Sequence, residues 1–248
     1  MSLILIGLDD TDSLDSRGTG RLARHLAVHL EQCGLGRSLG VSRHQLLVDP
    51  AIPYTSHNSS LCVALETGSR PDEILAVSRT VMEDDFVPGS DPGLCVARPD
   101  QMTPEVLSFG ARAAQVVVTE ADAYRVAREA GVFLVALGGT GLGVIGALAA
   151  VAQRAAGTEG RFVELRGVRA VPELLSVAQL KVATDIADIR DTAGCSVAEG
   201  EMVETLGWIR PSLVDGAPIL LVERHPEVAG HWTPCLRRHH IGRHHDDR

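Results

Sequence analysis

Three aspartates within four positions, Asp9, Asp10 and Asp12, follow an apolar run at residues 3–8. Carboxylates this close repel one another unless a cation or several hydrogen-bond donors lie among them. Mg²⁺ binds carboxylate oxygen and leaves coordination sites for water and phosphate. A continuous apolar run is typical of a strand buried on both faces, and open α/β sheets bind ligands where such strands end. The pattern therefore predicts a Mg²⁺ and phosphate site, with Asp9, Asp10 and Asp12 as metal ligands and catalytic carboxylates.

A threonine between two glycines follows this acidic loop. Apolar residues recur with helical spacing over 19–32, so Thr19 lies at the start of a predicted helix. There, a hydroxyl and the free N–H groups of the first turn can meet an anion. An alternative is that the acids serve the helix itself, with Asp12, Ser13 or Asp15 as its cap. On the first interpretation, the nucleotide contacts of this region are Thr11, Ser13, Gly18, Thr19 and Gly20.

A second glycine-rich turn, at 138–146, connects a predicted strand at 132–137 to a helix of small residues at 147–156. Such a turn lets backbone N–H groups approach a phosphate, although a P-loop lysine is missing and the spacing differs from the dinucleotide fingerprint. Close packing of the helix is an equally good reason for the glycines. Further helices are expected at 71–82, 104–117, 120–130 and 172–180, and further strands at 45–48, 60–66, 162–165 and 218–223.

Composition limits the classes of function. The chain has 248 residues, 45% hydrophobic, enough for one large domain or two small ones. Its formal charge of −9 and its 3% aromatic residues argue against a broad nucleic-acid surface. Lys181 is the only lysine, so phosphate contacts must come from Arg, His, backbone N–H groups or a metal.

The five cysteines are scattered and form no C-x-x-C pair, which predicts reduced thiols rather than a disulfide framework or a zinc ribbon. No window reaches the ~20 apolar residues of a membrane span, and the N-terminus lacks the basic flank and cleavage site of a signal peptide. A soluble, cytoplasmic protein without a membrane partner is expected.

Several segments, in this order and at this spacing, resemble the archaeal agmatidine synthetases of isoleucine tRNA. The likeness covers about 150 N-terminal residues, and continues more faintly from Phe162 through 219–222 to 231–232. The segments that carry it are 7–13 (GLDDTDS), 43–47 with 49–54 (DPAIPY), 91–93 (DPG) and 143–150 (GVIGALAA).

The resemblance implies a kinase-like α/β nucleotide-binding domain at 1–160 and a smaller ferredoxin-like α+β domain at 161–235. It implies ATP and Mg²⁺ as cofactors, held by the three aspartates, with Thr19 matching a threonine that can itself accept phosphate. Gly141 and Gly143 would cradle the nucleotide phosphates. Where the family has a basic run, this chain has TSHNS at 55–59, which leaves His57 and Asn58 as candidate phosphate contacts.

The C-terminal segment 236–248 is rich in His and Arg and is expected to be a disordered tail. With His225, His231 and Cys235 it offers metal ligands, but no spacing brings them together. The expected function is ATP-Mg²⁺-dependent phosphoryl transfer to a small-molecule or RNA acceptor that the sequence does not identify. Strong tRNA binding is not expected, because the barrel and zinc ribbon of the family lie beyond the matched segments. A non-catalytic nucleotide-binding or anion-binding module is the first alternative, and a metal-binding protein that uses the His-rich C-terminal segment is the second. The chain is also a candidate to form a homodimer.

Overall fold

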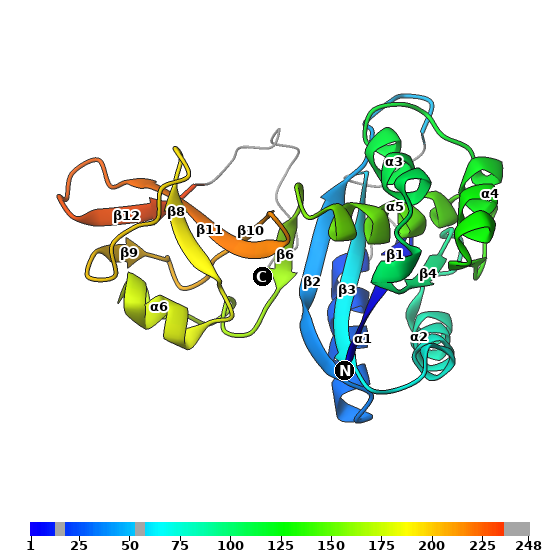
Figure 1. Ribbon diagram of the computed structural model, residues 1–248, viewed down its shortest axis with the longest axis horizontal. Coiled ribbons are helices and arrows are strands. Elements are labelled where there is room, and N and C mark those ends of the chain that lie inside the picture. Colours follow the sequence, from blue (N-terminus) through cyan, green and yellow to red (C-terminus); the bar gives the residue numbers. More distant parts are fainter. Residues whose placement is uncertain (13–17, 53–57, 236–248) are drawn as a thin grey trace. The chain divides into compact units, whose positions relative to one another are not determined.

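The computed structural model describes residues 1–12, 18–52 and 58–235, and it divides into two compact units (Figure 1). The first covers Met1–Ala156 and the second begins at Gly157. Within the described ranges, no helix is long and apolar enough to cross a membrane.

The sheet of the first unit has the strand order β5-β4-β1-β3-β2, and each neighbouring pair is antiparallel. The central strand β1 is buried along most of its length, as its apolar run predicts. Its neighbours, however, run in the opposite direction, so the C-terminal ends of β1 and β5 meet the N-terminal ends of β3 and β4 at one edge. The bounds are β1 Ser2–Asp9, β2 Arg37–Gln45, β3 Ser59–Thr67, β4 Gly93–Ala97 and β5 Phe133–Ala136.

Helices cover both faces of this sheet. Leu5, Cys62 and Cys95 share one hydrophobic cluster with α3, α4 and α5. On the other face, Gly20 of α1 approaches Leu61, which pairs with Leu8 of β1. The helices are α1 Thr19–Gln32, α2 Pro71–Asp85, α3 Pro104–Ala113, α4 Glu120–Ala130 and α5 Gly143–Ala156, with a short 3₁₀ turn at Pro99–Gln101.

Glycines allow α5 to lie unusually close to β1. A Cβ atom at Gly7 would lie 2.0 Å from the carbonyl oxygen of Ala147, and one at Gly146 would lie 1.8 Å from Oδ2 of Asp9. A Cβ atom at Gly143 would lie 1.9 Å from the carbonyl oxygen of Asp91. Close packing therefore requires glycine at these positions, whatever else the glycine-rich turn does.

One strand of the first unit was predicted at the wrong place and another was not predicted. The strand expected at 45–48 is β2, which ends at Gln45, and β4 was not predicted. Strand β2 lacks an apolar pattern because its buried side chains include Ser42 and His44, whose Oγ and Nε2 atoms lie 2.8 Å apart. The two polar groups satisfy each other, so burial here leaves no hydrophobic signature.

The second unit has the strand order β6-β10-β11-β12-β9-β7, with β8 parallel to β11. The helix expected at 172–180 was misplaced, because Ser176 caps a helix that starts one residue later, and its Oγ accepts from the N–H of Gln179 at 3.2 Å. The bounds are β6 Arg161–Glu164, β7 Leu174–Ser176, α6 Val177–Ala183, β8 Asp188–Asp191, β9 Met202–Glu204, β10 Ser212–Val214, β11 Ala217–Arg224 and β12 His231–Pro234.

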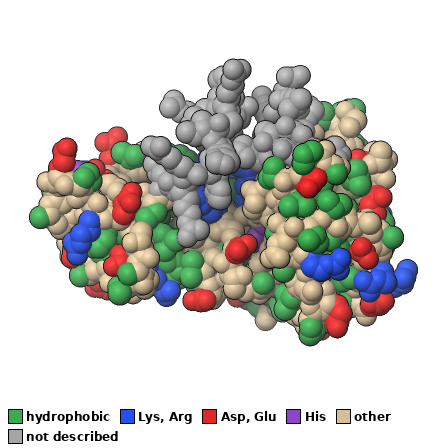
Figure 2. Space-filling model, turned by 90° about the horizontal axis from the view of Figure 1, so that it is seen from above, with side chains coloured by type: hydrophobic (Ala, Val, Ile, Leu, Met, Phe, Trp, Pro, Cys, Tyr) green, Lys and Arg blue, Asp and Glu red, His purple; other side chains and the backbone are tan. Residues whose placement is uncertain are grey.

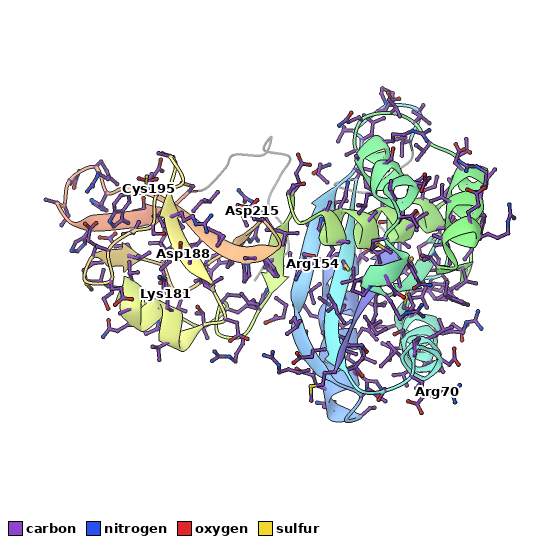
Figure 3. All side chains as sticks on the ribbon, viewed as in Figure 1. Arg70, Arg154, Lys181, Asp188, Cys195 and Asp215 are labelled. Carbon is purple, nitrogen blue, oxygen red and sulfur yellow. The ribbon has the colours of Figure 1, made fainter. Side chains whose placement is uncertain are left out.

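The only lysine ties α6 to β8 (Figure 3). Its Nζ lies 3.0 Å from Oδ1 of Asp188, and Nε of Arg190 lies 3.1 Å from Oδ2. The hydroxyl of Ser196 donates to the same Oδ2 at 2.6 Å. Partial burial alone would raise the pKa of Asp188, but the hydrogen bonds from Ser196, Lys181 and Arg190 hold it well below its usual range. The carboxylate is thus ionised and fully paired.

Candidate functional site

Asp9, Asp10, Asp12 and Asp91 gather at one edge of the first unit's sheet, which we call the acidic edge. Asp9 ends β1 and pairs with Gly93 at the start of β4. Helix α1 begins soon after Asp12, and α5 begins beside Asp91, at Gly143. The acidic edge therefore combines clustered carboxylates with the N-terminal ends of two helices, which favour negative charge.

Asp9 is the member of the acidic edge most strongly held away from water. Its carboxylate lies against Gly146 of α5 and accepts a hydrogen bond from the N–H of Asp10. Burial raises the pKa of Asp9 well above its usual range, and the charges of Asp10 and Asp12 add to this, while the hydrogen bond opposes it. A cation beside Asp9 would oppose this shift.

Asp10 has a φ angle of +48°, a left-handed conformation that non-glycine residues rarely adopt. Partial burial and the charges of Asp91 and Asp12 raise its pKa to about 6, although the N–H of Asp91 donates to its carboxylate. Strained backbone and raised pKa values often occur together at functional sites. Asp10 combines both.

These carboxylates suit Mg²⁺ by their chemistry. Hard carboxylate oxygen is the ligand that Mg²⁺ prefers, and it commonly takes only one or two carboxylates, with water and substrate phosphates completing its shell. Among the residues that the structure describes, no group of three His, Cys, Asp or Glu side chains is placed so that it could hold a metal ion. The three aspartates therefore do not form a metal site by themselves in this arrangement, and a Mg²⁺ bound here would need phosphate oxygens or water as further ligands.

Two threonines connect the acidic loop to α1. The N–H of Thr19 donates to Oδ2 of Asp12 at 3.2 Å, and the N–H of Thr11 donates to Oγ1 of Thr19 at 3.4 Å. Asp12 thus accepts a hydrogen bond from the first N–H of α1, although the N-cap position itself is held by Gly18, which has no side chain to cap with. Thr11 is 3% exposed, and its Oγ1 has no hydrogen-bond partner within the described part of the chain. A buried hydroxyl in this state is available to a ligand.

The glycine-rich turn encloses the carboxylate of Asp91. The N–H groups of Thr140 and Gly141 both donate to Oδ1, at 2.9 Å for Gly141, and Oγ1 of Thr140 donates to Oδ2 at 2.7 Å. We did not predict this role from the sequence, because these contacts span about 50 residues and nothing local indicates them. The segment 91–93 was noted only as part of the resemblance.

The other predicted contacts are distributed as follows. Gly18 has a φ angle of +76° and directly precedes α1, which explains glycine there. Asn58 is bound to the chain itself, because its Nδ2 donates to the carbonyl of Leu47 at 2.6 Å. Ser13 and His57 lie outside the described residues.

Two of the predicted metal ligands near the C-terminal end of the chain come together. Nε2 of His225 lies 3.5 Å from Oε2 of Glu204, and Nδ1 of His231 lies 3.4 Å from Oε1. Cys235 uses its N–H for a hydrogen bond to Leu221 at 2.8 Å. The remaining histidines of the predicted tail, at 239–245, lie outside the described residues.

Charged side chains on one face of the molecule are mixed in sign. On the face seen in Figure 2, acidic, basic and hydrophobic side chains are interspersed. Where described residues form this face, no broad positively charged patch of the kind that binds nucleic acid without sequence preference is visible.

Comparison with known proteins finds similar solved structures. No family model matches the chain, and no curated protein matches it. A complex of TiaS with an isoleucine tRNA and ATP has 26% identity and a TM-score of 0.55, over 61% of this chain and 36% of that one. A tRNA fluorescent labelling enzyme has 27% identity and a TM-score of 0.52, over 60% and 36%.

The structure of TiaS alone, described as a tRNA agmatidine synthetase, has 24% identity and a TM-score of 0.53, over 60% of this chain and 35% of that one. The resemblance to agmatidine synthetases expected from the sequence is thus confirmed, and the mixed α/β fold resembles theirs. The chain spans about a third of the length of these solved structures.

Proposed function

We propose that this chain binds Mg²⁺-ATP at the acidic edge and transfers a phosphoryl group in tRNA modification. The observation that carries the proposal is the gathering of Asp9, Asp10 and Asp12 beside the first turn of α1. Desolvation and mutual repulsion raise the pKa values of Asp9 and Asp10, and a bound cation would relieve both effects. ATP brings such a cation together with the phosphates that complete its coordination.

The similar structures support the nucleotide and the biological setting. TiaS has been crystallised with an isoleucine tRNA and ATP, and also with AMPCPP and agmatine. This chain matches only about a third of the length of those chains, so that their substrates are also its substrates is part of the proposal. We further propose that the first unit is the kinase-like domain, expected at 1–160, and that the second is the ferredoxin-like domain, expected at 161–235.

Each residue of the acidic edge has a proposed part in the reaction. Asp9, Asp10 and Asp12 are the residues that would hold Mg²⁺ together with the phosphates, and the ion would supply neutralisation of charge on the transferred phosphate. The hydroxyl of Thr19 and N–H groups of the first turn of α1 contact the phosphates, although the N–H of Thr19 itself donates to Asp12. The buried hydroxyl of Thr11 gains a partner. The first turn of α5, from Gly143, adds its dipole. The N–H of Gly141 is already donated to Asp91, so its contribution is to the shape of the turn.

Calorimetric titration with ATP, with and without Mg²⁺, tests binding, and incubation with γ-labelled ATP and transcribed tRNA tests transfer. We expect binding that requires Mg²⁺, and label transferred to the RNA or first to the protein. Binding without transfer to any acceptor would instead identify a non-catalytic nucleotide-binding module. Absence of ATP binding would contradict the proposal.

A further inference from the structure

The glycine-rich turn is built around one side chain, that of Asp91. Three donors from two residues, Thr140 and Gly141, meet its two carboxylate oxygens. Gly139 has a φ angle of +63°, and a Cβ atom there would lie 1.9 Å from Oδ1 of Asp91. Glycine at 139 is therefore required by the approach of Asp91, without reference to any ligand.

The backbone of Asp91 is fixed on its other sides. Its N–H donates to the carboxylate of Asp10, and its carbonyl oxygen packs against the Cα of Gly143 at the start of α5. The carbonyl oxygen of the next residue, Pro92, accepts a hydrogen bond from the N–H of Leu137 at 2.8 Å. Asp91 thus links the two loops: its side chain binds the glycine-rich turn, and its backbone N–H binds the acidic loop.

The same contacts limit where phosphate can bind. A phosphate at the glycine-rich turn would need the N–H groups of Thr140 and Gly141, which already donate to a carboxylate, and it would meet that negative charge at contact distance. At the start of α1, one N–H likewise donates to a carboxylate, since the N–H of Thr19 lies 3.2 Å from Oδ2 of Asp12.

We propose that Asp91 is a positioning residue of the nucleotide site: it clamps the glycine-rich turn and thereby sets the place of Asp10 and of the N-terminal end of α5. The expected effect of Asp91 on ATP affinity rests on the proposed function. A contrasting role, in which Asp91 occupies the turn until phosphate displaces it, predicts the opposite effect on affinity and is decided by the same experiment.

Two substitutions separate shape from charge. Asp91→Asn keeps the hydrogen bonds, because its carbonyl oxygen can accept from both N–H groups and its amide can donate to the Thr140 hydroxyl. Asp91→Ala removes them all. The matched control is Asp100→Ala. Asp100 follows the C-terminal end of β4, opposite to the end at the acidic edge, and its Oδ1 lies 3.0 Å from Nε of Arg98.

Two quantities are measured for each variant: amide hydrogen exchange of the peptide covering 137–143, and the dissociation constant of Mg²⁺-ATP. We expect Asp91→Ala to speed hydrogen exchange of the turn. It should also weaken ATP binding by roughly tenfold to a hundredfold, because the groups that contact ATP would be displaced. Asp91→Asn should stay within about threefold of wild type in affinity, less than a lost hydrogen bond to a charged group costs. The control should change neither quantity.

Other outcomes overturn the assignment in distinct ways. Faster exchange with unchanged affinity would reduce Asp91 to a structural residue, and tighter binding by Asp91→Ala would show that it competes with phosphate. Equal losses in the Asn and Ala variants would place Asp91 among the charged ligands instead. A wild-type protein that does not bind Mg²⁺-ATP would overturn the proposed function, and unchanged exchange in Asp91→Ala would overturn the clamp by itself.

Discussion

The hydroxyl of Thr19 accepts a hydrogen bond from the backbone N–H of Thr11 at 3.4 Å, across the acidic loop. Helix α1 therefore starts with a side chain that faces back toward the carboxylates. Thr19 is 7% exposed, so its hydroxyl is directed into the fold. This contact gives Thr19 a structural use that must be separated from any contact with phosphate.

The first prediction separates the two uses of Thr19. Thr19→Ser should preserve both stability and ATP affinity, since it keeps the hydroxyl. Thr19→Ala should cost ~1 kcal/mol of unfolding free energy, as loss of one hydrogen bond does. If Thr19 contacts phosphate, the Ala variant should also lose ATP affinity beyond that amount, measured by calorimetry alongside urea unfolding. Equal ATP affinity in all three proteins would leave Thr19 with a structural role only.

The acceptor role of Thr19 is a separate prediction. The resemblance implies that this threonine can itself take the γ-phosphate. Incubation with γ-labelled ATP should then label the wild-type protein and leave Thr19→Ala unlabelled. Label on the Ala variant at the wild-type level would exclude Thr19 as the acceptor.

Removal of one carboxylate should weaken the binding of Mg²⁺-ATP. Asp10→Asn is close in shape but loses the charge that a metal needs, and we expect a loss of several kcal/mol in binding free energy. Calorimetric titration measures it. Asp72→Asn, at an exposed position in the first turn of α2, is the control and should bind as wild type does. An Asp10 variant with the affinity of the control would exclude a metal role for Asp10.

Stability should depend on pH through the raised pKa of Asp10. The folded protein keeps a proton on Asp10 up to about pH 6, whereas the unfolded chain releases it near 3.8. Without metal, the unfolding free energy should therefore fall as pH rises across this window, and Asp9, whose pKa is also raised, adds to the fall. Urea unfolding in chelator measures this. Asp10→Asn should reduce the slope, and an identical slope in both proteins would contradict the raised pKa.

Binding of tRNA by this chain should be weak. Its net charge of −9 and the mixed charges of the visible surface provide few sites for counterion release. Gel shifts at physiological salt should give dissociation constants no tighter than the ~10⁻⁴ to 10⁻⁶ M of non-specific binding. Nanomolar, sequence-dependent binding would contradict this prediction.

Local patterns predicted much of the first unit and little of the second. The bounds of α1 and α4 follow from helical spacing and from the glycines after them, and β1 follows from its apolar run. Strand β2 was not located correctly because paired polar groups, Ser42 and His44, take the place of hydrophobic residues among its buried side chains. Strand β4 was not predicted because its first residues continue a loop rich in Pro and Gly.

The candidate site was predictable where its residues are neighbours in sequence. Asp9, Asp10 and Asp12 form one motif, and Thr19 follows closely. Asp91 was not predictable, because its partners lie about 50 residues later and are mostly backbone groups, which have no residue type to recognise. Antiparallel pairing of β4 with β5, in which Gly93 lies opposite Ala136, creates that proximity, and it depends on the fold as a whole.

The pairing of Lys181 with Asp188 has a practical consequence for chemistry on this protein. A chain with a single ε-amino group offers one internal target to acylating reagents, to crosslinkers and to enzymes that attach other proteins through isopeptide bonds. That amine is held 3.0 Å from an ionised carboxylate that also binds Arg190. The rate at which Lys181 is acylated would thus show whether the contact between α6 and β8 is intact. The acidic edge carries no lysine, so the same reagent would leave its side chains unmodified.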